Sequence, residues 1–222
     1  MASHRLCLIH PHDPRVVPTG VVETRLRTVL AALPSDFTVL VVGADHAGDL
    51  ETGATETIDV AGRRVDFLPV MRAGASSFAA ALMRHLPAVR TAARAEVASI
   101  SVHDLTWVPL ARLVGRPVVL VVHHDPRAGA VAGRVPLTAA LRETVALRVA
   151  DRIVGCDAGF VRRCRDGHPA VAAKTELLVL PSGEDAGAVA LFDEDAQIAR
   201  LWERHRRLYD AHPIQRGRHV AA

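Results

Sequence analysis

Apolar residues follow two different spacings along this chain, and the two alternate. Residues 37–43 and 117–123 are nearly continuous apolar runs, typical of strands that are buried on both faces of a sheet. Residues 20–33 instead place apolar side chains three and four positions apart, which predicts an amphipathic helix. Because strand-like and helix-like segments alternate through most of the chain, the sequence predicts βαβ units and a mainly parallel sheet.

The same two patterns predict the remaining elements. The expected strands are residues 5–10, 37–43, 57–60, 63–70, 99–103, 117–123, 152–156 and 175–180. The expected helices are residues 20–33, 73–97, 105–114, 137–150, 158–165 and 193–211, the second of them broken near Pro87. Strands 57–60 and 63–70 flank Ala61-Gly62 and form either a hairpin or two separate short strands. Residues 44–56 and 181–193 read as loops.

The predicted fold class is α/β, with a single Rossmann-like, doubly wound parallel sheet. Right-handed crossovers lead to this topology, in which ligands bind beyond the carboxyl ends of the strands. We expect residues 1–192 to form this domain, residues 193–211 a C-terminal amphipathic helix and residues 212–222 a flexible tail.

Composition narrows the classes of function. Of the 222 residues, 50% are hydrophobic and 23% are charged, so the chain can bury a sizeable core. The net charge of +3 is small and forms no basic tail, so a nucleic-acid surface is not expected. No apolar run approaches the ~18 residues of a transmembrane segment.

Targeting and cysteine usage favour a cytoplasmic protein. The first apolar stretch, residues 6–9, is ended by His10 and Pro11 and is too short for a signal peptide. The three cysteines form no CxxC pair, which fits a reducing compartment and buried thiols.

The predicted strand ends carry the candidate chemistry. Gly20 begins a helix whose free N–H groups can hold an anion or a hydroxylated ligand, although Thr19 or Gly20 can equally be an ordinary helix cap. His123, His124 and Asp125 follow the clearest strand. A histidine there can act as a base or bind a substrate hydroxyl, with Asp125 orienting it, or the three can be a plain polar strand end.

A metal site is the weaker interpretation of these histidines. It would combine the side chains at both strand ends, namely His10, His12, Asp13, His123, His124 and Asp125. Their spacing matches no known zinc signature, and 12 histidines produce clusters by chance. We therefore expect no bound metal.

Five segments, in order, resemble a known family. Residues 18–33 are similar to a Gly-rich loop and first helix of the form P-x-x-G-G-x-E, with Thr19 in place of the first glycine. Residues 102–112 and 117–125 are similar to the two strands that end in histidines. Residues 150–158 are similar to A-D-R-V-V-x-x-S, with Asp157 where Ser is common, and residues 180–192 are similar to P-N-G-V-D-x-x-x-F. Together they resemble the N-terminal domain of family 4 glycosyltransferases, which have the two-domain GT-B architecture.

The resemblance implies one half of a GT-B fold that binds the sugar acceptor. The nucleotide-sugar donor is a co-substrate, with no other cofactor, and the family holds it mainly in a second domain whose motifs are not found after Phe192. The implied partners are therefore the acceptor, the nucleotide sugar, and a separately encoded donor-binding domain or a second copy of the chain. In the family a C-terminal helix crosses back onto the N-terminal domain, and residues 193–211 match it in place.

The resemblance also implies roles for particular residues. His123 or His124 would contact the donor sugar or the acceptor, with Asp125 beside them. Donor and acceptor contacts would also come from Thr19, Gly20, Glu23 and His103, with Gly20 close to the donor phosphates. Whether the lone chain transfers a hexosyl group is left open by the sequence.

Three alternatives remain. The first is a catalytically inactive binding or regulatory remnant of a glycosyltransferase, and the second is an α/β domain that binds nothing small. The third is a hydrolase similar to zinc-dependent sugar deacetylases, because residues 10–13 resemble their H-P-D-D metal loop. In that loop Pro14 stands where another acidic residue is expected.

Overall fold

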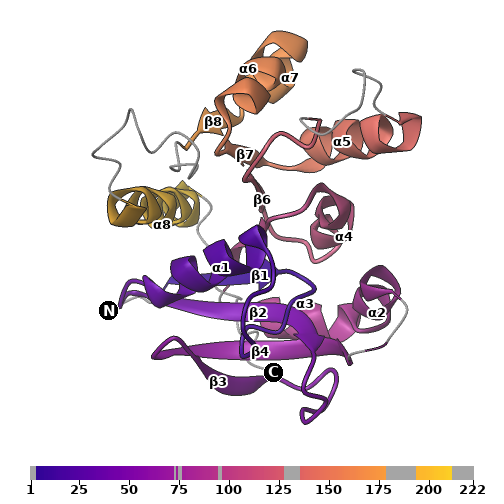
Figure 1. The fold of residues 1–222 in the computed structure, drawn as a ribbon, viewed down its shortest axis with the longest axis vertical. Helices are drawn as coiled ribbons and strands as arrows, with labels where there is room; N and C mark the ends of the chain where they lie inside the picture. Colours follow the sequence, from indigo (N-terminus) through magenta and orange to yellow (C-terminus); the bar gives the residue numbers. More distant parts are fainter. Residues whose placement is uncertain are drawn as a thin grey trace, which may run out of the picture.

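Eight strands form one sheet in the order β3-β4-β2-β1-β5-β6-β7-β8 (Figure 1). The computed structural model describes residues 4–72, 74, 77–94, 97–127, 136–178 and 194–211. The strands are β1 (His4–Ile9), β2 (Phe37–Asp45), β3 (Glu56–Val60), β4 (Arg63–Arg72), β5 (Val97–Val102), β6 (Val118–Val122), β7 (Arg152–Gly155) and β8 (Thr175–Leu177). All neighbours pair in parallel except β3 and β4. The predicted α/β class is confirmed. Of the two possibilities for residues 57–60 and 63–70, the structure has the hairpin, formed by β3 and β4.

Helices cover both faces of the sheet. They are α1 (Val21–Ala31), α2 (Phe78–Arg84), α3 (Leu86–Arg94), the 3₁₀ turn η1 (Leu105–Trp107), α4 (Val108–Arg112), α5 (Leu137–Val149), α6 (Ala158–Gly167), α7 (Pro169–Ala172) and α8 (Glu194–Ala211). One apolar cluster packs α1 and α8 against one face of the sheet. A second cluster packs the helices from α2 through α7 against the opposite face. The chain is therefore a three-layer sandwich with the strands in the middle.

Alternation along the strands assigns side chains to these layers. Leu6 and Leu8 of β1 belong to the cluster under α1 and α8, whereas Cys7 and Ile9 belong to the other cluster. Each of these four side chains is at most 2% exposed. A strand covered on both faces has no polar side to show, which is why its sequence is a continuous apolar run.

The helical segment predicted over residues 73–97 is two helices, and the predicted break near Pro87 falls at His85. Helix α2 ends at His85, whose backbone N–H donates to Ala81 and Met83 carbonyls. Pro87 then lies in the first turn of α3, where its missing N–H would have had no intrahelical partner. The proline starts the second helix and does not interrupt one helix in its middle.

Other boundaries shift by a few residues. Strand β2 continues to Asp45, because Ala44 and Asp45 pair with the end of β4. The short helix α7 was not predicted; Pro169 begins it and the His168 side chain accepts from the Ala170 N–H. The predicted loop 181–193 and tail 212–222 lie outside the described residues. Among the helices that are described, none is both long and apolar enough to cross a membrane.

Candidate functional site

The two halves of the sheet meet between β1 and β5. From β1 the chain continues outward through β2 to β4, and from β5 it continues the other way through β6, β7 and β8. In such sheets the point where the direction reverses opens a crevice at the carboxyl ends of the strands. The candidate site is therefore built from the residues that follow β1, β5, β6 and β7.

Four polar side chains follow these strands in a row and lie on the same face of the sheet, the face that α1 and α8 cover. On the face under α1 and α8, counting in twos along each strand leads to the first residue beyond it, from apolar core residues in β1, β6 and β7 and from Ser99 and Ser101 in β5. In chain order these residues are His10, His103, His123 and Cys156. The pleat itself thus brings together four groups that are up to 146 positions apart in sequence (156 − 10).

His103 and His123 form a hydrogen-bonded pair. His103 Nδ1 lies 2.8 Å from His123 Nε2, and the two rings stack with their centroids 5.0 Å apart. The far side of each ring is also engaged, because His103 Nε2 lies 3.2 Å from Ser101 Oγ and His123 Nδ1 lies 3.9 Å from Cys156 Sγ. The four groups form one chain across β5, β6 and β7, so the tautomer of one ring sets that of the other.

Burial keeps this pair uncharged. Desolvation lowers the pKa of His103 well below its usual value and lowers the pKa of His123 to about 3, with the neighbouring cations and rings adding to the effect. Burial also raises the pKa of the Cys156 thiol to about 12. A protonated thiol is a poor nucleophile, so the raised pKa favours an unreactive thiol at half-buried Cys156.

His10 is the histidine of the row with a free ring nitrogen. Its side chain is 6% exposed, and its Nδ1 has no hydrogen-bond partner among the described residues. Burial lowers the pKa of His10 to about 4, against an opposing effect of the Glu23 carboxylate. His10 is therefore neutral at pH 7 and retains hydrogen-bonding capacity for a group that enters the site.

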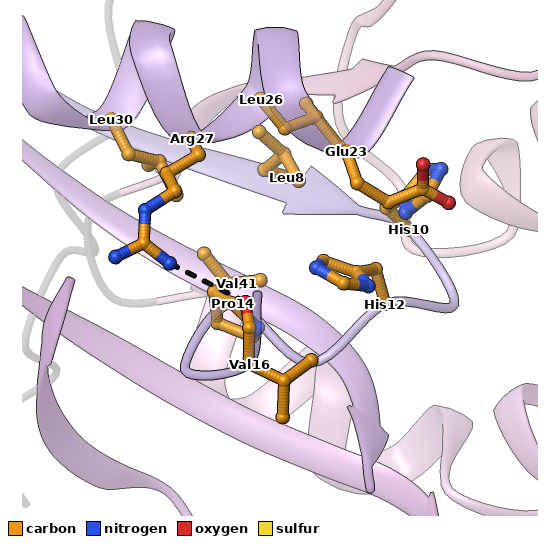
Figure 2. Close-up of a pocket in the computed structure, with 10 residues that line it drawn as sticks. All are labelled: Leu8, His10, His12, Pro14, Val16, Glu23, Leu26, Arg27, Leu30 and Val41. Carbon is orange, nitrogen blue, oxygen red and sulfur yellow. Dashed lines mark hydrogen bonds between the residues drawn. The ribbon is translucent and has the colours of Figure 1, made fainter. Parts of the chain in front are cut away.

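A small pocket of about 20 Å³ adjoins His10 under the first turns of α1. Figure 2 shows His10, His12 and Glu23 grouped at one end of it and Arg27 and Leu30 at the other. This volume holds about one water molecule, so the pocket is a recess of the site and cannot enclose a sugar. Burial lowers the pKa of His12 as well.

The start of α1 is filled by a side chain of its own first turn. Gly20 precedes the helix in an extended conformation with φ −132° and has no side-chain cap. A Cβ on Gly20 would lie 2.1 Å from Glu23 Oε2, so the glycine is what lets the carboxylate fold back over the helix N-terminus. Thr19 is exposed beside it. Of the residues suggested for this corner, Gly20 and Glu23 are thus in contact and Thr19 lies at the rim.

Asp125 and His124 are not gathered with His123. Asp125 accepts a hydrogen bond from the Arg163 guanidinium and another, of 2.8 Å, from the backbone N–H of Arg127. Buried Glu143 joins the same network, with both arginines at 2.8 Å. His124 is exposed. The described contacts of Asp125 therefore run to arginines, and none of them orients His123.

The loop after β1 is held by a second buried network, which the sequence did not indicate. The Asp13 and Asp45 carboxylates are both fully buried, and Arg15 Nη2 donates to them at 2.7 and 2.6 Å. Burial alone would raise the pKa of Asp13, but hydrogen bonds from Arg15 and from backbone N–H groups outweigh it and lower the pKa. Asp13, a candidate zinc ligand in the deacetylase hypothesis, is thus bound to arginine. Within the described part of the chain, no three His, Cys, Asp or Glu side chains are arranged to hold a metal ion.

The sequence did not identify Ser101 as a partner of His103 or Cys156 as a partner of His123. For Cys156 the signal is period-two counting along β7 from Val154, and for Ser101 it is the same counting along β5 back from His103. These contacts also depend on which strands are neighbours in the sheet, and hydrophobic periodicity does not predict the strand order.

Comparison with known proteins identifies the fold. No protein-family model matches the sequence, and a search of curated proteins finds no match. A solved structure of sucrose-phosphate synthase from Thermosynechococcus elongatus aligns with 93% of this chain and 99% of its own, with a TM-score of 0.55 and 13% identity. A UDP-glucosyltransferase from Polygonum tinctorium, described as capable of glucosylating indoxyl, aligns with 89% of this chain at a TM-score of 0.46 and 12% identity, and the match covers 56% of its length. The first of these likenesses shows that the chain has the Rossmann-like half-domain fold found in a glycosyltransferase.

Proposed function

We propose that this chain is the acceptor-side half of a glycosyltransferase and binds a sugar at the carboxyl edge between β1 and β5. The observation that carries the proposal is the row of neutral histidines at this switch point, in a fold shared with a glycosyltransferase. The nearest alternative is a binding module of the same fold without transfer activity.

The chemistry of the row suits a polyhydroxylated ligand. A neutral imidazole offers one donor and one acceptor to hydroxyl groups, and a carboxylate accepts from two of them. His10 has an unpaired nitrogen here, and Glu23 lies beside it at the start of α1. We assign both to the acceptor. His103 then forms the wall of the site, positioned by its bond to His123.

His123 retains the reaction-centre role that the resemblance implies, with one condition. Its Nε2 is engaged by His103 at 2.8 Å, whereas its Nδ1 has only the 3.9 Å contact with the Cys156 sulfur. Of the two, the sulfur contact is the weaker and is the one that a hydroxyl of the sugar would replace. His124 is exposed and Asp125 is bound to an arginine, so we assign neither of them to the acceptor. Both would instead contact the donor-binding domain when it packs over this edge.

The donor is proposed to be a nucleotide sugar held mainly by a second domain that packs over the same edge. Glu23 supports this division, because its carboxylate occupies the helix N-terminus that would otherwise attract a phosphate. Donor phosphates would approach Gly20 and Thr19 only after the Glu23 side chain turns toward the acceptor.

Saccharide binding to the purified chain tests the proposal. Thermal melts and ligand-detected NMR with mono- and disaccharides, alone and with UDP-, GDP- and ADP-glucose, should show binding. Glu23→Ala should weaken it at least tenfold, whereas Glu56→Ala, which removes a carboxylate from the exposed edge strand β3, should not change it. Binding of no saccharide, or equal binding by both variants, would refute the proposal. Saccharide binding without transfer when a donor domain is supplied would favour the non-catalytic module.

A further inference from the structure

A second pocket lies under α8, toward the amino ends of β6 and β7 and so away from the carboxyl edge. It has a volume of about 240 Å³. Its apolar floor is made by Val119, Val154 and Leu201. Its polar lining consists of Arg152, Glu176, Arg204, His205 and Arg207. It therefore combines an apolar surface from the sheet with cations from two different elements.

Positive charge predominates at the rim. Arg204 Nη1 is buried and is ion-paired at 2.5 Å with Glu176 Oε2, the carboxylate of the lining. Arg207 is largely exposed and has one contact of 3.3 Å with Glu203, outside the pocket. The described contacts of Arg152 include no carboxylate. Three guanidinium groups thus face one carboxylate within the lining.

His205 adds a neutral group at the back of the pocket. It is 3% exposed, and its Nδ1 lies 3.4 Å from Ser99 Oγ of β5. Burial lowers its pKa to about 4, so the ring is uncharged at pH 7 and offers hydrogen bonds without competing charge. The ring of Trp202, on the same helix, lies 6.0 Å from His205 by centroid distance.

We propose that this pocket binds a small organic anion, with a phosphate or carboxylate group at the arginines and an apolar or ring body on the valine floor. Guanidinium groups bind both kinds of oxyanion in a bidentate manner. The volume suits a molecule of about the size of phenyl phosphate. Because Arg152 belongs to β7 and Arg204 to α8, the bound anion would link the helix to the sheet.

Phenyl phosphate, benzoate and uncharged benzyl alcohol are the probes for this pocket. Trp107→Phe leaves Trp202 as the single tryptophan, whose fluorescence then reports binding beside His205. At about 100 times its Kd, a bound probe should also raise the melting temperature by about 5–10 °C. We expect saturable binding of at least one of the two anions and none of benzyl alcohol. The two anions separate a phosphate site from a carboxylate site.

Three arginine variants decide whether the pocket is responsible. Arg152→Gln and Arg204→Gln should each weaken binding at least tenfold. Arg200→Gln removes the same charge from an exposed position of α8 outside the pocket and should leave the affinity unchanged. Arg204→Gln could weaken binding by loosening α8. Arg152 lies on strand β7, so Arg152→Gln tests the pocket without changing a residue of that helix. Failure of both anions to bind, or equal loss in all three variants, would overturn the proposal. Neither result depends on saccharide binding at the carboxyl edge.

Discussion

Two buried polar clusters lie at the carboxyl edge of the sheet and meet the cost of burial in opposite ways. The cluster of Asp13, Arg15 and Asp45 keeps its charges and stabilises them by ion pairing and by hydrogen bonds from backbone N–H groups. The pair of His103 and His123 gives up its charge and remains as hydrogen-bonded neutral rings. A charged cluster fixes the shape of a loop, whereas the neutral ring of His123 keeps one weakly engaged nitrogen, Nδ1, for which a hydroxyl group can compete. The comparison thus separates the part of the edge that holds the structure from the part that we assign to chemistry.

The largest expected effect is the response to mild acid. His10, His103, His123 and His205 all have a lowered pKa in the folded chain because they are buried, whereas the unfolded value is near 6.5. Between the two values the unfolded state binds more protons, so stability falls as the pH drops below about 6.5. From pH 7.5 to 5.5 the four rings together should cost about 5 kcal/mol of stability.

Urea unfolding at several pH values measures this loss. The charged cluster should respond in a different window, because the pKa values of Asp13 and Asp45 are lowered by their hydrogen bonds. Their contribution is complete above about pH 4 and is lost only as the pH falls further toward their folded pKa values. A stability that stays constant down to pH 4 would mean that the histidines are charged or solvated in the folded chain.

Removing the cation of the charged cluster should have the next largest effect. Arg15→Gln leaves two fully buried carboxylates without their shared partner, and loss of one member of such a cluster costs about 3 kcal/mol. Arg64→Gln, at an exposed position of β4, should change stability by less than about 0.5 kcal/mol. Urea unfolding at pH 7 compares the two variants. Equal, small losses would show that water reaches the carboxylates.

Adjacent histidines provide a sharper contrast. His123→Ala removes the partner of the His103 Nδ1, and leaving a buried polar group unpaired costs about 2 kcal/mol. His124→Ala alters an exposed side chain and should remain within about 0.5 kcal/mol of the parent. Thermal unfolding at pH 7.5 separates the two variants. A similar loss in both variants would contradict the buried pairing.

The sequence predicts the sheet well because burial on both faces leaves a strong signal. Runs such as residues 117–123 are apolar throughout, and the helices between them carry three- and four-residue spacing. Their positions agree with the structure to within a few residues, including the break near Pro87, apart from the unpredicted helix α7. Helix-to-loop boundaries depend on caps and single prolines, whose signal is weaker.

The candidate site was predictable in part. The carboxyl ends of parallel strands point to His103 and His123 whatever the strand order, since both follow apolar runs. The partners of Asp125 and Asp45 were not predictable. Arg163 lies 38 positions from Asp125, and Arg15 lies 30 positions from Asp45. Each of these ion pairs joins a loop residue to a residue at a distant place in the sequence, in helix α6 for Arg163 and at the end of β2 for Asp45, and no periodicity records that contact.

The smallest expected effect distinguishes the two contacts of His123. Cys156→Ala removes a weak thiol contact at 3.9 Å and leaves the 2.8 Å bond to His103. Because that shorter bond dominates, the ring should keep its tautomer, and the loss of stability should stay below about 1 kcal/mol. Ring ¹⁵N chemical shifts report the tautomer, and Cys164→Ala removes a sulfur from the opposite face as the control. A change of tautomer in the Cys156 variant alone would show that the thiol orients His123. A sugar hydroxyl that replaced the thiol would then also change the tautomer of His103 and its hydrogen bond to Ser101.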